Sequence, residues 1–296
     1  MKGSWWAIEL KAKNEKDIEK KNQIYQSGLS TFPQSSDLNE RYAIYLFDER
    51  MDYELAETYF KRAFDLDPDK PGGNVNYALF LVRANRGSDL AETHFKKAYA
   101  LNPDSTFCIS EYARFLADIR KKYDSAEKLF KRALELDPND AASHCYYAEL
   151  LKVGRQDYDN AETHFKKAIE IDPESAVAHG NYAIFLNYIR KQYDDAEKHY
   201  KRSLELASGP SRTISSLHVN YASFLQWVRK DYDSAEIHYR KSLEARPDDS
   251  KINDSYAFLL HIYRKDYENA EKYYIKALES DPNNGRSEER RVGKEC

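Results

Sequence analysis

The sequence has few cysteines, glycines and prolines for its length. Of 296 residues, 3 are cysteine, 10 are glycine and 9 are proline. The cysteines form no CxxC pair and no even set, so a disulfide framework is not indicated and a reducing, intracellular setting is expected. So little glycine and proline argues against an all-β protein and favours long helices.

Charge and hydropathy exclude further classes of protein. The 46 basic and 50 acidic residues give a formal net charge of -4, and no block of five or six like charges occurs. A nucleic-acid-binding arm or a polybasic membrane patch is therefore not indicated. The apolar stretch near the N-terminus is too short for a signal peptide or a membrane span. We expect a cytoplasmic protein that has neither nucleic acid nor membrane as a partner.

What the sequence does have is a period. Seven copies of the dipeptide Tyr-Ala follow one another in steps of 35 residues, apart from one step of 39, and Ala-Glu and proline recur in the same frame. Three markers in one register indicate an array of structural repeats. The tyrosines of the dipeptide are Tyr42, Tyr77, Tyr112, Tyr147, Tyr182, Tyr221 and Tyr256.

Each copy has the pattern of two helices. Most copies end in Asp-Pro or Asn-Pro, and proline cannot continue a helix. Small alanines allow two helix axes to approach closely, and aromatic side chains fill the space beside them. Two apolar stripes of helical spacing predict the core of the fifth copy: Tyr182, Ala183, Leu186 and Ile189, then Tyr193, Ala196, Tyr200, Ser203 and Leu204.

These features resemble the tetratricopeptide repeat. Alanine, three residues, an aromatic residue and then proline, as in Ala91, Phe95 and Pro103, is similar to the second half of that repeat. The first half departs from it, with His179 at the family's tryptophan position, and one extra residue is expected in the turn between the helices. Half-a-TPR repeats are an alternative, since residues 200–204 are similar to them. The resemblance implies an all-α solenoid of helix-turn-helix repeats that forms a right-handed superhelix.

The register divides the chain into repeats and two flanking segments. Residues 1–35 have the pattern of a degenerate N-terminal repeat. Residues 285–296 break the register, and the last eleven match the translation of a sequencing adapter, so we expect a non-native, disordered tail. The natural protein is then expected to continue, and the uncapped last repeat could self-associate. The seven repeats are 36–70, 71–105, 106–140, 141–175, 176–214, 215–249 and 250–284.

No residues indicate catalysis or metal binding. HExxH, Walker, GxSxG and GxGxxG motifs are absent, so no catalytic residue, cofactor or metal is expected and the chain is not expected to be an enzyme. Histidines of the second helices are expected on an outer face, one helix-packing distance of about 8–10 Å or more apart. That separation is too large for a shared zinc ion. These histidines are His94, His164, His199 and His238.

The resemblance implies that the first helices line a concave groove for partner peptides. In repeats five to seven their exposed stripe is apolar and aromatic, which needs a reason, whereas in repeats one to three it is more charged. Asparagine can both donate to and accept from a peptide backbone. Packing against the next first helix is the alternative. The expected groove residues are Asn76, Arg83, Asn181, Ile184, Tyr188, Asn220, Trp227, Phe258 and Ile262.

Three functions remain open. The first is a protein-interaction scaffold that binds a partner peptide or helix in the groove. The second is a regulatory, substrate-recruiting arm of a longer, truncated enzyme. The third is a half-a-TPR-like scaffold in RNA processing that binds proteins. The family's carboxylate clamp is absent, because its positions hold Asp37, Arg41, Gly72, Asn76, Phe107 and Glu111.

Overall fold

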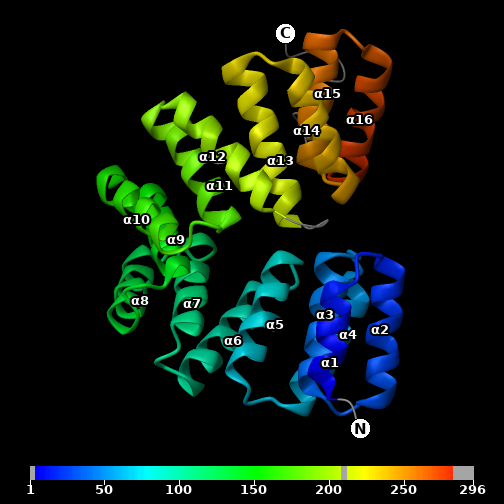
Figure 1. Cartoon of the computed structure of the whole chain (residues 1–296), viewed down its shortest axis with the longest axis vertical. Helices are drawn as coiled ribbons and strands as arrows, with labels where there is room; N and C mark the ends of the chain where they lie inside the picture. Colours follow the sequence, from blue (N-terminus) through cyan, green and yellow to red (C-terminus); the bar gives the residue numbers. More distant parts are fainter. Residues whose placement is uncertain (1–3, 208–211, 283–296) are drawn as a thin grey trace. The chain divides into compact units, whose positions relative to one another are not determined.

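A computed structural model describes residues 4–207 and 212–282 (Figure 1). The described residues form helices joined by short turns, without a strand among them. The expected all-α repeat solenoid is therefore confirmed. None of the helices in these ranges is both long and apolar enough to cross a membrane. The expected disordered tail lies outside the described residues. The chain divides into unit 1, Met1–Pro173, and unit 2, Glu174–Cys296, and each is described by itself.

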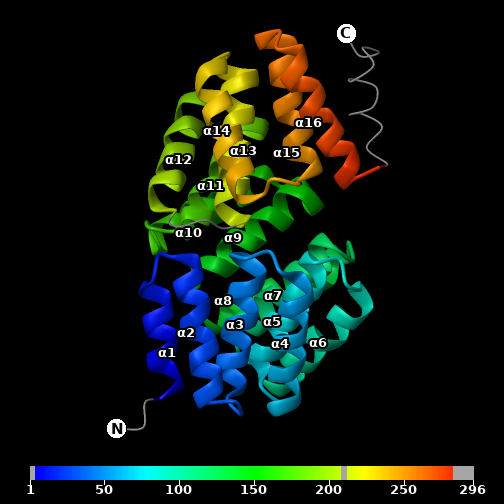
Figure 2. The same ribbon diagram turned by 90° about the vertical axis from the view of Figure 1, so that its right-hand side faces the viewer.

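Unit 1 is a row of antiparallel helix pairs in which each helix packs mainly on its partner and then on the next pair. Figure 2 shows α3 and α4 lying side by side, as in Figure 1. Its helices are α1 (Trp5–Asn14), α2 (Ile18–Thr31), α3 (Ser36–Asp48), α4 (Tyr53–Leu66), α5 (Pro71–Arg83), α6 (Ser88–Leu101), α7 (Thr106–Asp118), α8 (Tyr123–Leu136), α9 (Ala141–Leu150) with the π-helical turn η1 (Leu151–Arg155), and α10 (Tyr158–Ile171).

Unit 2 has the same construction, and every first helix in its described part ends in a π-helical turn. Helices α13 and α14 form one pair, and α14 then contacts α15 of the next pair. The elements are α11 (Ala176–Phe185) with η2 (Leu186–Arg190), α12 (Tyr193–Leu206), α13 (Arg212–Phe224) with η3 (Leu225–Arg229), α14 (Tyr232–Ala245), α15 (Ser250–Phe258) with η4 (Leu259–Arg264), and α16 (Tyr267–Ser280).

The core follows the expected stripes. Ala196 and Tyr200 of α12 are buried, and the Tyr200 ring lies 5.5 Å from that of Tyr221 in the next pair. In contrast, Tyr193 is 37% exposed, so its assignment to the core was wrong. It is the first residue of α12. Because helical side chains point toward the N-terminus, a first residue has no preceding turn to cover it.

In the four repeats whose first helix ends in η1, η2, η3 or η4, the extra residue is absorbed by the end of that helix, where the chain widens into a π turn. The residue after η2, Lys191, adopts a left-handed φ of 58°. The next backbone N–H, of Gln192, then donates to the carbonyl of Leu186 at 3.0 Å. The same bond joins Asp231 to Leu225 at 3.0 Å after η3. The insertion expected in the connecting turn therefore widens the helix end itself.

The glutamate of the Ala-Glu dipeptide connects successive helix pairs. In unit 2, Arg229 at the end of η3 reaches back to α12, where its Nε lies 2.6 Å from Glu197 Oε2 and its Nη2 lies 2.6 Å from Asp194 Oδ1. In unit 1, Arg120 Nε lies 2.7 Å from Glu92 Oε2 in the same way. Solvent screening keeps such pairs weak, so they fix the register between pairs more than they add stability.

Candidate functional site

The π turns of unit 2 present large apolar side chains to solvent. Tyr188 in η2 is 56% exposed, Trp227 in η3 is 48% exposed and Ile262 in η4 is 36% exposed. All three belong to the expected groove residues. Since π turns often occur at functional sites, their position in three successive pairs makes this surface the candidate site.

Trp227 belongs to a group of rings, hereafter the aromatic cluster, formed by Trp227, Tyr232, Phe258 and Tyr263. The Trp227 ring lies 5.4 Å from that of Phe258 and 6.2 Å, edge-on, from that of Tyr263. Tyr263 in turn stacks on Tyr232 at 4.2 Å. Because the cluster joins the first helix of one pair to that of the next, it contributes to packing as well as to the surface.

The remaining groove residues of unit 2 are less exposed. Asn181, Ile184, Asn220 and Phe258 are half-buried. Their partial burial agrees with a packing role, which the sequence left as the alternative. The exposed part of the expected groove in unit 2 is therefore reduced to Tyr188, Trp227 and Ile262.

The first-helix face of unit 1 is charged, and its charges are matched internally. Glu40 is buried, and its carboxylate accepts from Asn76 Nδ2 at 2.6 Å and from Lys70 Nζ at 2.5 Å. The Asn76 amide is thus held by the protein itself. Arg83, the other expected residue here, is exposed, with its Nη1 4.0 Å from Asp48 Oδ1.

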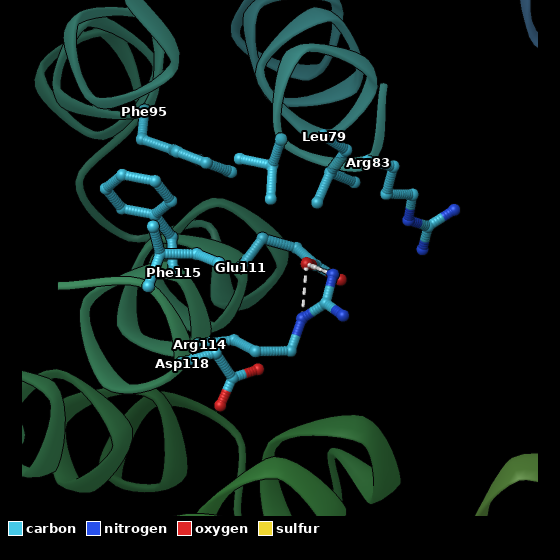
Figure 3. Close-up of a pocket in the computed structure, with 9 residues that line it drawn as sticks. Leu79, Arg83, Phe95, Glu111, Arg114, Phe115 and Asp118 are labelled. Atoms are coloured by element: carbon cyan, nitrogen blue, oxygen red, sulfur yellow. Dashed lines mark hydrogen bonds and ion pairs between the residues drawn. The ribbon is translucent and has the colours of Figure 1, made fainter. Parts of the chain in front are cut away.

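A small hollow of about 60 Å³ lies between α5 and α7 of unit 1 (Figure 3). Phe95 and Phe115 close its apolar end, and Arg114 turns back so that its Nε lies 3.0 Å from Glu111 Oε2. Burial raises the pKa of Asp118, against the opposing effect of Arg114. The hollow has room for a few water molecules or one small side chain.

The second-helix histidines face their own first helix, so their expected position on an outer face was wrong. His144 Nδ1 lies 2.7 Å from His164 Nδ1 in unit 1, and His179 and His199 make the same contact at 2.8 Å in unit 2. At these distances one nitrogen donates and the other accepts, so both rings cannot be protonated together. Burial, and to a smaller extent the partner histidine, lowers the pKa of His164 and His199 to about 4.

Two positions that lie 20 residues apart change together from one repeat to the next: where one residue is polar the other is polar, and where one is apolar so is the other. This correlation in the sequence could have revealed the pairs. A zinc ion bound to both rings would hold the nitrogens about 3.3 Å apart, so the observed distances describe a hydrogen bond. Within the described residues, no group of three or more metal-ligating side chains occurs. The contacts are Asn74–His94, His144–His164, His179–His199 and His218–His238, and Ile109 and Leu129 occupy the same two positions in the third repeat.

The outward face of α16 repeats a surface that α14 uses for packing. On α14, Tyr232 stacks on a ring of the next pair, and Glu236 Oε2 lies 3.0 Å from Arg264 Nε. The matching tyrosine of α16, Tyr267, is 59% exposed and lines a hollow of about 190 Å³ together with Glu271. This face therefore has the chemistry to accept another helix.

Three stretches of the chain match family models described as tetratricopeptide repeat. They are residues 117–176, 164–198 and 254–284. No curated protein matches the chain in sequence.

Several solved structures have a similar fold. A chain in the crystal structure of the APC/C hetero-tetramer Cut9–Hcn1 matches with a TM-score of 0.67 and 14% identity, over 97% of this chain and 55% of that one. Yeast Tom70 matches with a TM-score of 0.60 and 20% identity, over 93% and 56%. The human IFIT1 dimer with m7Gppp-AAAA matches with a TM-score of 0.60 and 22% identity, over 90% and 68%. This chain spans little more than half of the first two, and at these identities the likeness shows the fold alone.

Proposed function

Since the chain is a tetratricopeptide repeat protein, we propose that it is an interaction scaffold whose unit 2 binds a segment of another protein. The segment contacts the exposed first-helix surface around Tyr188, Trp227 and Ile262. The observation that carries the proposal is the exposure of two large aromatic side chains in successive π turns. Asn181, Asn220, Ile184 and Phe258 form the half-buried floor between them.

The chemistry of these side chains suits binding. Trp and Tyr are the residue types that most often supply binding energy at protein interfaces, because they bury a large area and lose little conformational freedom. Trp227 is also held in place by the rings of Phe258 and Tyr263. A side chain that is already ordered costs less entropy when a partner covers it.

Unit 1 adds a second, smaller contact surface in this proposal. The hollow between α5 and α7 admits one small side chain of a partner, and Arg83 lies at its edge. Asn76 has its amide nitrogen bonded to Glu40, which leaves the carbonyl oxygen of its side chain as the group that would meet a partner backbone. Its contribution is therefore expected to be weaker than that of Trp227.

Fold alone does not decide between a protein and a nucleic acid, because one fold supports different sites. IFIT1 has a similar fold and is seen with m7Gppp-AAAA, whereas the Cut9–Hcn1 chain assembles with protein. In this chain the net charge is -4. The arginines nearest the two surfaces are committed to carboxylates, Arg114 to Glu111 and Arg229 to Glu197. These two guanidinium groups are therefore not free to bind phosphates, which favours protein.

Selection of displayed random 12-residue peptides against the full chain tests the proposal. The affinity of a selected peptide is then measured for the wild type and for Trp227→Ala and Tyr188→Ala. We expect each substitution to weaken binding by about 2 kcal/mol, or about 30-fold, as for other interface anchors. Ile237→Ala is the matched control, because Ile237 is 54% exposed but lies on the second helix α14.

Circular dichroism should show unchanged helicity for all three variants, with a slightly lower melting temperature for Trp227→Ala alone, because its ring also packs on Phe258. If Trp227→Ala and Tyr188→Ala unfold unit 2, these side chains belong to the core and the proposal fails. It also fails if both variants stay folded and bind every selected peptide as tightly as Ile237→Ala does.

A further inference from the structure

We infer that the segment bound by unit 2 is acidic, with bulky apolar residues next to aspartate or glutamate. This inference rests on the proposed function, because it concerns the same surface. The feature that carries it is a row of lysines beside the exposed apolar side chains.

Each π turn of unit 2 is followed by a lysine. Lys191, Lys230 and Lys265 stand three residues after Tyr188, Trp227 and Ile262, respectively, and all three lysines are exposed. Among the residues that the structure describes, none of their ammonium groups has a carboxylate within ion-pair distance. Three successive helix pairs therefore present the same two groups, one apolar and one cationic.

The acidic residues closest in sequence are committed elsewhere. Asp231 follows Lys230 and caps α14, where its Oδ1 accepts from Ser234 N at 3.1 Å. Asp266 follows Lys265 and caps α16, accepting from Asn269 N at 3.2 Å. Hydrogen bonds from the side chains of Ser234 and Asn269, and then these backbone bonds, lower the pKa of both carboxyls, so both stay ionised at the helix N-termini.

The exposed stripe itself carries no carboxylate. Its members in unit 2 are Asn181, Ile184, Tyr188, Asn220, Ser223, Trp227, Ser255, Phe258 and Ile262. In unit 1 the matching stripe includes Asp48, Glu111 and Asp118. The end of the unit 2 stripe that holds the lysines is thus the cationic end, and negative charge on a partner is the complement.

The backbone conformation of the three lysines belongs to the turn itself, since Met51, Lys121 and Gln156 adopt it at the same position in unit 1. All three lysines occupy a left-handed conformation, with φ of 58° at Lys191, 58° at Lys230 and 56° at Lys265. The Lys230 ammonium lies 5.8 Å from the Trp227 ring centroid, so charge and apolar anchor are adjacent. A partner that buries an apolar side chain on Trp227 brings its neighbouring carboxylate to Lys230.

Single-stranded RNA would also combine stacking with cations, but the geometry favours a peptide. Stacking of bases needs open ring faces. Here the Trp227 ring packs against Phe258 at 5.4 Å, and the Tyr232 and Tyr263 rings cover each other at 4.2 Å. Ile184 and Ile262 are aliphatic and offer no ring for stacking.

The test uses the peptides selected by display on the full chain and a chemically synthesised copy of the strongest binder. We expect the selected peptides to be enriched in Asp or Glu beside Trp, Phe, Leu or Tyr. Converting the acids of the copy to their amides should weaken binding at least tenfold. The triple variant Lys191→Gln, Lys230→Gln, Lys265→Gln should do the same, whereas the matching Lys→Arg triple keeps the affinity within threefold.

A control triple removes the same charge from second helices: Lys198→Gln on α12, Lys241→Gln on α14 and Lys272→Gln on α16. It should change the affinity by less than twofold. Raising the salt concentration from 50 to 300 mM should weaken binding of the peptide to the wild type. It should not weaken binding to the variant Lys191→Gln, Lys230→Gln, Lys265→Gln, called the groove triple below.

The outcomes separate the two proposals. If the selected peptides are neutral, and Trp227→Ala weakens their binding whereas the groove triple does not, the inference of an acidic partner is refuted and the scaffold proposal stands. Peptides indifferent to Trp227→Ala and Tyr188→Ala refute the scaffold site, and the inference falls with it. A 20-nucleotide oligouridylate that binds unit 2 and displaces the selected peptide would replace the acidic peptide with RNA.

Discussion

The histidine pairs make the stability of the array depend on pH. Three pairs, His144–His164, His179–His199 and His218–His238, each join a first helix to its second helix through an Nδ1–Nδ1 contact of 2.7 to 2.8 Å. In the first of these, His144 Nε2 also lies 3.1 Å from the carbonyl oxygen of Pro138. His144 therefore donates through Nε2 and accepts at Nδ1, so His144 itself cannot be protonated while the pair is intact.

The sign follows from the direction of the pKa shifts. Burial lowers the pKa of His164, His199 and His238 to about 4, below the ordinary 6.5 of the unfolded chain. The unfolded chain therefore binds more protons between these values. Stability is fully present above pH 6.5, falls as the pH drops toward 4 and levels off below it.

The magnitude is set by one proton per pair. A full shift corresponds to about 1.4 kcal/mol per pH unit. Because these second-helix rings are partly exposed, we reduce this to about 1 kcal/mol per pair between pH 7.5 and 5.5. The three pairs together should then lower the free energy of unfolding by about 3 kcal/mol over that interval, which precedes the titration of most carboxylates.

The chain supplies its own control. The third repeat, with α7 and α8, has Ile109 and Leu129 where the fourth, with α9 and α10, has His144 and His164. The double variant His144→Ile, His164→Leu should lose one pair's share of the pH dependence, about 1 kcal/mol. Urea unfolding at pH 7.5, 6.5 and 5.5 measures this, and hydrogen exchange of α9 and α10 locates it, since damage in a repeat array is local. An unchanged difference between pH 7.5 and 5.5 in the folded variant refutes the reasoning.

Two further predictions concern the turn after α7 and the outward face of α16. Lys121→Gly should raise the free energy of unfolding by about 0.5–1 kcal/mol, because Lys121 has a φ of 55°, which costs a side chain more than glycine. As the control, Lys128→Gly inside α8 should lower the free energy of unfolding by about 1 kcal/mol. The urea midpoints of the two variants are compared with that of the wild type. The exposed face of α16 should support self-association of the chain, so sedimentation velocity should detect dimers or larger species that Tyr267→Lys reduces; a wild type that stays monomeric at 100 μM contradicts this.

Most of the fold could be predicted because its signals are periodic. The equivalents of Ala196 and Tyr200 and the Tyr-Ala dipeptide recur in one frame. A period of 35 residues that contains two apolar stripes of helical spacing is compatible with few architectures. The widened helix ends could not be predicted in the same way. An added residue can enter a turn or a helix. Only the left-handed backbone at Lys191 and the hydrogen bond from the N–H of Gln192 to the carbonyl of Leu186, six residues back, show which occurred.

The candidate site was predicted less completely. Exposed apolar residues at helical spacing indicated Tyr188, Trp227 and Ile262. The same reasoning could not tell that the Asn76 amide is held by Glu40, because that bond joins neighbouring helix pairs. The histidine pairs were missed for a different reason. Each histidine was compared with its equivalents in other repeats, whereas its partner lies 20 residues away in the same one.

A comparison of equivalent positions indicates where the repeat leaves freedom for binding. At the alanine where two helices meet, successive copies hold Ala161, Ala196, Ala235 and Ala270, and all are buried. In the middle of the π turn, by contrast, the residues are Val153, Tyr188, Trp227 and Ile262, and all are exposed. The fold restricts the first position to one small side chain and does not restrict the second. The core does not require a large side chain at the second position, so the variable π turns are where a binding function can differ from one repeat to the next.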